Sequence, residues 1–302
     1  MSSPIAVFGS INMDLVIFSQ RQPEEGETIF GRSFETFQGG KGANQAVAVS
    51  RLGGEVTFIG KVGNDLFGEQ LKESLVTEGI DISMLEQHEG ESGIAFINVF
   101  EQSSQNQIIV VSGANAHLRS DQFLEESLKS TEVLISQLEA PVKEIEKVFS
   151  RAKEFDCYTI LNTAPAIEMS QQLITKTDLF IMNESELATF SSININDGDL
   201  DSIQTAIKSL SFRDNQSVVI TLGSKGVFVD SKSKQAFIQG HHVEAIDSTG
   251  SGDCFVGALA NNFLEHRDLL QAVEFANKAA ALSVTKKGAS ISVPTIEEVN
   301  KV

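Results

Sequence analysis

Residues 247–259 read DSTGSGDCFVGAL, and this stretch decides the fold prediction. Apolar residues at 243–246 predict the end of a strand, and apolar residues at helical spacing over 254–263 predict a buried helix. The small residues between them predict a tight loop that leads into the helix N-terminus. The first backbone N–H groups of a helix have no intrahelical partner and lie at the positive end of the helix dipole, so this loop is suited to bind an anion.

Asp253 is the unexpected residue at that helix start, because a carboxylate repels an anion. A general base for a hydroxyl that attacks a phosphate would give it a function. The alternative is that Asp253 is only the residue that caps the helix, and the stretch by itself does not decide between the two.

The composition restricts the class of protein. The chain has 302 residues, with 41% hydrophobic and 21% charged, which is the balance of a globular α/β protein. No apolar run reaches the roughly 18 residues that a membrane span needs, so no membrane partner is expected. The net charge of −18 argues against a nucleic-acid partner, because phosphate backbones are bound by basic surfaces.

The N-terminus and the two cysteines predict a cytoplasmic protein. The chain passes directly into a predicted strand, without a basic region or a cleavage pattern. Cys157 and Cys254 lie far apart in predicted buried segments. Two reduced core thiols are therefore expected instead of a disulfide.

Strand and helix patterns alternate along the chain, which predicts an α/β fold with a doubly wound, mostly parallel sheet flanked by helices. Polar residues follow three predicted strands, at Glu139, Asn162 and Asn183, where open α/β sheets bind ligands. Residues 28–37 and a hairpin of 93–100 with 107–111 predict a small separate sheet. No repeat or linker divides the chain, so a single domain of residues 1–302 is expected.

Three further sites suggest ligand contacts. Asn12 and Asp14 follow the first strand and share a face if the chain stays extended, although a solvated turn is the alternative. Residues 38–46, QGGKGANQA, form a glycine cluster whose Lys41 and Asn44 can bind a polyol, and the spacing is not that of a P-loop.

Asn183 and Glu186 lie within one helical turn, suited to a metal–phosphate group, and a solvated first helical turn is the alternative. Taken together, these strand-end groups favour phosphoryl transfer from a nucleotide to an alcohol over hydride or acyl transfer.

Eight motifs resemble, in order and over essentially the whole chain, those of the ribokinase-like carbohydrate kinases. They are GSINMD at 9–14, GGKGANQA at 39–46, QLE at 137–139, NTAP at 162–165, NESE at 183–186, TLGSKG at 221–226, DSTGSGD at 247–253 and VTKKGA at 284–289. The resemblance implies a lid sub-domain from about 12–36 and 91–110, a homodimer formed through this lid sheet, and phosphorylation of the 5-hydroxyl of D-ribose by ATP. Other sugars or a nucleoside, such as 2-deoxyribose or fructose, remain alternatives, as does a non-catalytic sensor.

The resemblance also implies residue roles. Asp253 would remove the proton from the sugar hydroxyl beside an anion hole of Gly250, Ser251 and Gly252. The expected sugar contacts are Asn12, Asp14, Gly40, Lys41, Gly42, Asn44, Glu139 and Asp253. The expected ATP contacts are Asn183, Glu186, Thr221, Gly223, Ser224, Gly226, Gly252 and Asn277, with Glu186 helping to organise Mg²⁺.

The resemblance also implies an activating monovalent cation, K⁺, bound mostly by backbone carbonyls. Its expected ligands are Asp247, Thr249, Ser283, Lys286, Gly288 and Ser292. Members of the family commonly have Ala at 250 and 251, Pro at 163 and His at 277, where this chain has Gly, Ser, Thr and Asn. The difference at 277 concerns the expected adenine contact, and none of the four removes a catalytic group.

Overall fold

The computed structural model describes residues 3–103, 105–195, 199–232 and 234–301, and short strands form a central sheet within these ranges. The strands are β1 (Ile5–Phe8), β4 (Val56–Gly63), β5 (Asp81–His88), β8 (Val133–Gln137), β9 (Tyr158–Asn162), β10 (Leu179–Asn183), β11 (Ser217–Thr221), β12 (Gly226–Ser231) and β13 (Lys234–Gln239). Their order is β13-β12-β11-β10-β9-β8-β1-β4-β5. Every neighbouring pair from β5 to β11 is parallel, and β12 and β13 complete the edge as antiparallel strands.

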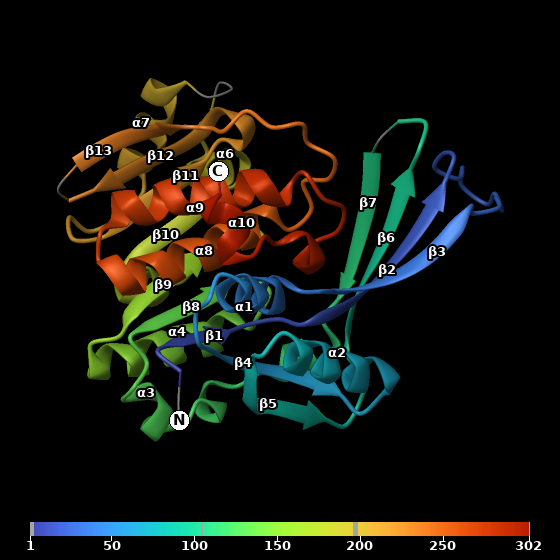
Figure 1. Cartoon of the computed structure of the whole chain (residues 1–302), viewed down its shortest axis with the longest axis horizontal. Coiled ribbons are helices and arrows are strands. Elements are labelled where there is room, and N and C mark those ends of the chain that lie inside the picture. Colours follow the sequence, from blue (N-terminus) through green and yellow to red (C-terminus); the bar gives the residue numbers. More distant parts are fainter. Residues whose placement is uncertain (1–2, 104, 196–198, 233, 302) are drawn as a thin grey trace.

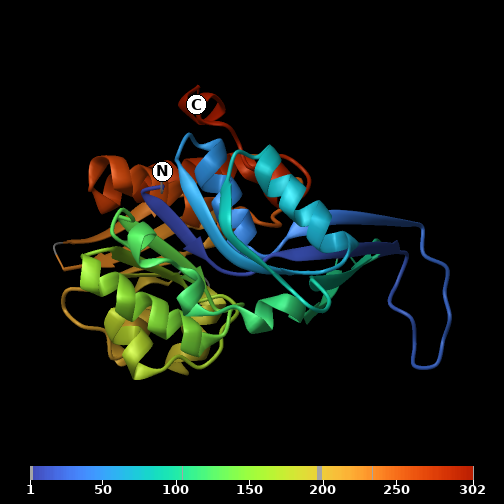
Figure 2. The same cartoon turned by 90° about the horizontal axis from the view of Figure 1, so that it is seen from below.

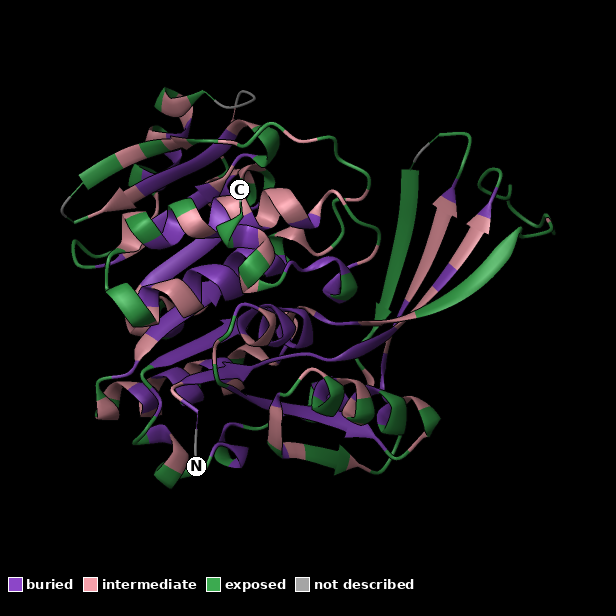
Figure 3. Ribbon diagram, in the orientation of Figure 1, coloured by how far each residue is buried: buried purple, intermediate pink, exposed green. Residues whose placement is uncertain are grey.

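Helices cover both faces of this sheet, as Figure 2 shows. One layer holds α1 (Lys41–Arg51), α2 (Leu66–Thr77), α8 (Ser251–His266) and α9 (Leu269–Ser283). The other holds α4 (Val142–Ala152), α5 (Gln171–Lys176), α6 (Glu184–Ser191) and α7 (Leu200–Ser209). The short helices α3 (Glu125–Leu128) and α10 (Ile296–Asn300) contribute Leu128 to the core under this second layer and Val299 to the core under the first. Alternate residues of β1 point into the two hydrophobic cores, with Val7 in one and Phe8 in the other. Both faces of the inner strands, such as β1, β4 and β8, are therefore buried, as in other parallel sheets (Figure 3).

A second sheet projects from one side of this body (Figure 1). Its strands are β2 (Asn12–Ser19), β3 (Ser33–Gly39), β6 (Gly93–Phe100) and β7 (Gln105–Val111), in the order β3-β2-β6-β7. Every described residue of β7 is exposed. The chain enters this sheet at Asn12, leaves it after Gly39, returns at Gly93 and leaves again after Val111. The strand register places all four connections at the same end of the sheet, which is its base.

The predicted fold class is confirmed, and three local predictions need correction. Residues 243–246 are not a strand, because the N–H groups of Ile246 and Asp247 donate to the carbonyl of Val284 at 2.7 and 3.1 Å and so tie the segment to the end of α9. The solvated turn at Asn12 is also wrong, since β2 begins there. The strand expected at 28–37 runs instead from Ser33 to Gly39. No helix in the described ranges is both long and apolar enough to cross a membrane.

Candidate active site

The carboxylate of Asp253 is held between two side chains of α1. Asp253 lies in the first turn of α8 and is 7% exposed. Its Oδ2 atom accepts a 3.0 Å hydrogen bond from Nδ2 of Asn44, and its Oδ1 atom accepts one of 3.0 Å from Nε2 of Gln45. The helix-cap alternative is wrong, because Gly250 is the N-cap of α8 and the carboxylate points to another helix.

Buried amides extend from this carboxylate into the sheet. A carboxylate only accepts hydrogen bonds, so Gln45 must present its nitrogen to Asp253. The Oε1 atom of Gln45 then accepts from Nε2 of Gln137 at 2.6 Å, and its Nε2 atom also donates to Oδ1 of Asn162 at 3.2 Å. Gln45 and Gln137 are both 0% exposed. This network, assembled from α1, β8 and β9, determines how the Asp253 carboxylate is oriented.

The loop before α8 leaves backbone amides free at the helix N-terminus. Gly250 has φ +73°, a left-handed conformation that disfavours other residues, and an added Cβ would lie 2.8 Å from Cα of Ala289. Within the described chain, the N–H groups of Gly252 and Asp253 donate to no acceptor. A Cβ added at Gly252 would meet nothing within 4 Å, so open space lies beside these amides. The geometry is that of an anion site next to a carboxylate.

Residues from three other elements surround Lys41 with negative charge. Asp14 belongs to β2, Glu139 follows β8 and Glu186 belongs to α6. The charge of Asp253 is the largest cause that raises the pKa of Lys41, burial opposes it, and Glu139, Glu186 and Asp14 raise it further. Glu139 is held by hydrogen bonds to its Oε2 atom from Oγ of Ser10 at 2.6 Å and from the N–H of Lys41 at 3.0 Å.

Asp14 and Asn44 present polar atoms that can bind a hydroxyl group. The pKa of Asp14 is raised from 3.8 to about 7, mainly by burial and also by the charges of Glu139 and Asp253, while the charge of Lys41 acts to lower it. Oδ1 of Asn44 is buried and has no hydrogen-bond partner in the described residues. A buried acceptor without a donor is costly, and a sugar hydroxyl would satisfy it. Gly40, the N-cap of α1, and Gly42 in its first turn lie at the same helix start.

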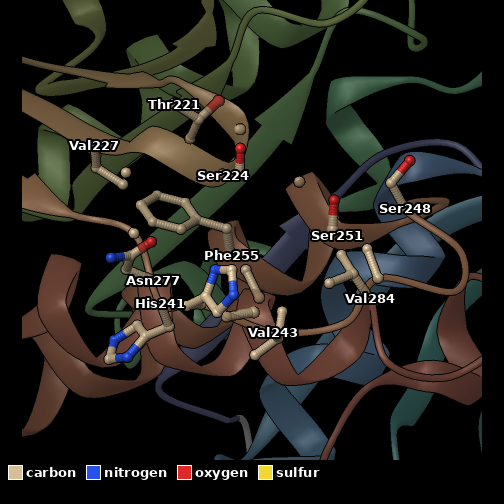
Figure 4. Close-up of a pocket in the computed structure, with 18 of the residues that line it drawn as sticks. Thr221, Ser224, Val227, His241, Val243, Ser248, Ser251, Phe255, Asn277 and Val284 are labelled. Carbon is tan, nitrogen blue, oxygen red and sulfur yellow. The ribbon is translucent and has the colours of Figure 1, made fainter.

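A cavity of about 410 Å³ opens on the other side of the α8 N-terminus (Figure 4). Among the expected ATP contacts, it is lined by Thr221, Gly223, Ser224, Gly226, Gly252 and Asn277. In Figure 4, Phe255, Asn277 and His241 lie towards one end of the cavity, and Ser248 and Ser251 lie towards the other. The end near Ser251 therefore adjoins the free amides beside Asp253.

Asn183 and Glu186 do not line this cavity. They form a reciprocal helix cap, in which Oδ1 of Asn183 accepts from the Glu186 N–H at 2.8 Å and Oε2 of Glu186 accepts from the Asn183 N–H at 2.9 Å. The alternative expectation, that these residues only form a solvated first helical turn, is therefore correct about the helical turn. It is wrong about the solvation, because Glu186 is only 8% exposed. Burial raises the pKa of Glu186. The negative charge of Glu186 in turn helps to raise the pKa of Lys41.

Asp247 connects two loops next to the anion site. Its Oδ1 atom accepts from the N–H and Oγ1 of Thr249 at 2.9 and 2.6 Å, and its Oδ2 atom accepts from the N–H of Gly288 at 2.9 Å. Burial acts to raise the pKa of Asp247, but these hydrogen bonds outweigh it and lower the pKa.

The other expected cation ligands take different positions around these loops. Ser283 and Ser292 are buried, with hydroxyls bonded to the carbonyls of Ala280 and Ala289 at 2.8 Å each. Lys286 directs its ammonium to Glu298 at 2.8 Å, so only its carbonyl remains for a cation. The described residues contain no group of three or more His, Cys, Asp or Glu side chains that could hold a metal. A cation here would therefore depend mainly on carbonyls.

Comparison with known proteins identifies the family. Residues 3–296 match the pfkB family of carbohydrate kinases. The chain belongs to this family. It is 40% identical to the ribokinase of Haemophilus influenzae, over 99% of this chain and 97% of that protein. It is 33% identical to the deoxyribokinase of Salmonella typhi, over 98% and 97%. A structure of Arabidopsis thaliana ribokinase, described as complexed with ribose and ATP, superposes with a TM-score of 0.91 at 29% identity, over 100% of this chain and 98% of that one.

Membership of the pfkB carbohydrate kinases confirms the predicted family and its kinase chemistry. Sequence reasoning missed several residues around the cavity. His241 and His242 are exposed and line the cavity, as do Gln239 and Phe255. Asn277 donates to the carbonyl of Gln239 at 2.9 Å, which brings α9 against the end of β13. The sequence signal that could have indicated their place in the cavity is the position of the two histidines between a strand and the anion loop.

Proposed function

We propose that this protein is a ribokinase that transfers the γ-phosphoryl group of ATP to the 5-hydroxyl of D-ribose. The observation that carries the proposal is the Asp253 carboxylate, which two amides hold beside the free N–H groups of a helix start. The nucleotide-sized cavity adjoins the same helix start. Relatives that match nearly the whole chain at 33–40% identity are named ribokinase, which supports ribose as the acceptor.

The proposed reaction is an in-line displacement. Asp253 takes the proton of the 5-hydroxyl, the hydroxyl oxygen bonds to the γ-phosphorus, and the bond to the β–γ bridging oxygen breaks to release ADP. The N–H groups of Gly252 and Asp253 stabilise the charge on the transferred group. Five side chains orient the sugar through polar atoms that bind its hydroxyls: Asn12, Asp14, Lys41, Asn44 and Glu139.

Two cations complete the proposal. Glu186 is suited to organise Mg²⁺, which binds mainly through phosphate oxygens and water and would neutralise phosphate charge. K⁺ would lie between Asp247 and residues 286–292, where it would order the anion loop and offset its negative charge. Asp247 fits this role because it already joins both loops through Thr249 and Gly288.

We further propose that the four-stranded sheet is a lid over the sugar and a homodimer interface. The strand register places Val110 on the same face as Asp14, through Ala95, whereas Ile109 and Phe34 lie on the opposite face. Ile109 and Phe34 are 56% and 59% exposed, and large exposed apolar patches mark interaction sites. A second copy of the chain would cover this far face. We expect the reaction to take place in the cytoplasm, and the two buried free cysteines support this expectation.

The proposal is tested by measuring ADP release from ATP with purified protein, with and without K⁺, on ribose, 2-deoxyribose and fructose. Ribose is expected to react with the highest kcat/KM. A clear preference for 2-deoxyribose would instead group the chain with deoxyribokinases such as the Salmonella relative. Sugar binding without turnover of any of them would favour a sensor.

A further inference from the structure

We infer that Asn115 is a positioning residue that fixes the side-chain amide of Asn12 with its nitrogen towards the sugar. This inference rests on the proposed function, because Asn12 matters to it only as a sugar contact. Asn115 lies outside every motif that the sequence suggested for the site.

The carboxamide of Asn115 makes three hydrogen bonds at the base of the lid sheet. Asn115 is 1% exposed and lies in the short helical turn Gly113–His117, just after β7. Its Oδ1 atom accepts from the N–H of Ile11 at 3.0 Å. Its Nδ2 atom donates to the carbonyl of Ile11 at 3.0 Å and to Oδ1 of Asn12 at 2.8 Å. The side chain thus uses both of its N–H bonds and its oxygen on two consecutive residues.

These contacts determine the orientation of both amides. The backbone of Ile11 offers one donor and one acceptor, so a rotated Asn115 amide would pair donor with donor and acceptor with acceptor. The second N–H of Asn115 must therefore point at Asn12, and Asn12 must accept this hydrogen bond with its Oδ1 atom. The Nδ2 atom of Asn12 then faces away from Asn115, and no described residue accepts a hydrogen bond from it.

Asn12 and Asp14 lie on the same face of β2, two residues apart. A sugar hydroxyl between them would accept a hydrogen bond from Asn12 and donate one to the carboxylate of Asp14. Asn115 therefore makes position 12 a donor, which complements the acceptor at position 14. A hydroxyl satisfies both groups at once, whereas a sugar that lacks it leaves both unpaired.

Gly93 provides the space for this contact. It pairs directly with Asn12 in the strand register, at the start of β6. An added Cβ would lie 2.2 Å from Nδ2 of Asn115 and 2.3 Å from Oδ1 of Asn12. The two hydrogen-bonded atoms would have to separate, so a side chain at this position is incompatible with the contact.

A double-mutant cycle tests the inference. Asn115→Ala is expected to raise the KM for ribose about tenfold, the upper range for loss of one neutral hydrogen bond, and to leave kcat and the KM for ATP within about twofold. In an Asn12→Ala background, Asn115→Ala should produce no further rise, because its effect passes through Asn12. Asn115→Asp should also raise the KM for ribose, because its second oxygen attracts the Asn12 nitrogen away from the sugar. Asn261→Ala is the matched control, since it removes an amide bond of 2.9 Å to the carbonyl of Leu52 outside the site.

The possible outcomes separate the two claims. An unchanged KM for ribose in Asn115→Ala, or equal losses in the wild-type and Asn12→Ala backgrounds, would overturn the positioning role. A wild-type protein that phosphorylates no sugar would contradict the proposed function, and the inference with it. A fall in kcat and melting temperature without a selective rise in the KM for ribose would mean that Asn115 only stabilises the fold.

Discussion

Nε2 of Gln45 lies 3.0 Å from Oδ1 of Asp253, although 208 positions separate the two residues in the chain. This hydrogen bond joins α1, which carries the proposed sugar contacts Lys41 and Asn44, to α8, whose N-terminus forms the proposed anion site. The proposed base and these two proposed sugar contacts therefore belong to one assembly of two packed helices. The proposed chemistry depends on that assembly.

Replacing Asp253 by Asn should remove turnover while retaining the fold. The amide cannot take the proton of the sugar hydroxyl, and general bases contribute roughly 10²–10⁴-fold to rates. A fall in kcat of about 10³-fold or more is expected, with sugar binding by calorimetry weakened by less than about tenfold. A variant with wild-type kcat would show that another group is the base.

Replacing Gln45 by Met should misalign the base. Met has a similar volume but donates no hydrogen bond, so Asp253 loses one of its two donors. We expect kcat to fall about tenfold and the KM for ribose to change by less than about threefold. Gln122→Met is the control, because Gln122 is also buried and donates to the carbonyl of Gly60 at 3.1 Å outside the site. Equal kcat values for the two variants would contradict the positioning of Asp253 by Gln45.

Asp14 should make the sugar-free protein less stable as pH rises. Its pKa in the folded chain is about 7, against 3.8 for the solvent-exposed carboxyl group of an unfolded peptide, so the folded state binds more protons between these values. The stabilisation present below about pH 4 is lost as pH rises through 7, by on the order of 2–4 kcal/mol. Denaturant unfolding between pH 4 and 9 should show this loss in the wild type and in Asp121→Asn, but not in Asp14→Asn. Parallel curves for all three proteins would disprove the prediction.

The far face of the lid sheet should hold two copies of the chain together. Ile109→Glu places a charge within the exposed apolar face, and burying it in an interface would be costly. Light scattering should then give a dimer for the wild type and a monomer for Ile109→Glu. Leu124→Glu is the control, because Leu124 is 59% exposed but precedes α3 on the body. A wild-type monomer, or an unaffected Ile109→Glu dimer, would argue against this interface.

Local signals made much of the site predictable from sequence. Strand periodicity and the polar residues after strands located Glu139, Asn162 and Asn183 at one edge of the sheet. Small residues before an apolar helix marked the start of α8. These features depend on neighbours within a few positions, which is what a sequence pattern reports.

Long-range contacts were not predictable in this way. No periodicity connects Asn115 with Asn12, because their 2.8 Å contact arises where three strands of the lid sheet meet the body. The mostly apolar residues at 243–246 have the sequence pattern of a strand. The N–H of Ile246 donates instead to the carbonyl of Val284, far along the chain. His241 and His242 line the cavity because the chain there crosses from β13 to the anion loop, which is a path that no local sequence pattern reports.

The central claim is that Asp253 activates a ribose hydroxyl for phosphoryl transfer from ATP. Phosphorus NMR of purified protein with ATP, Mg²⁺, K⁺ and ribose tests it most directly, with Asp253→Asn measured in parallel. We expect equal amounts of ADP and ribose 5-phosphate to accumulate with the wild type and almost none with the variant. ADP without a sugar phosphate, or ribose 5-phosphate formed equally by both proteins, would contradict the account.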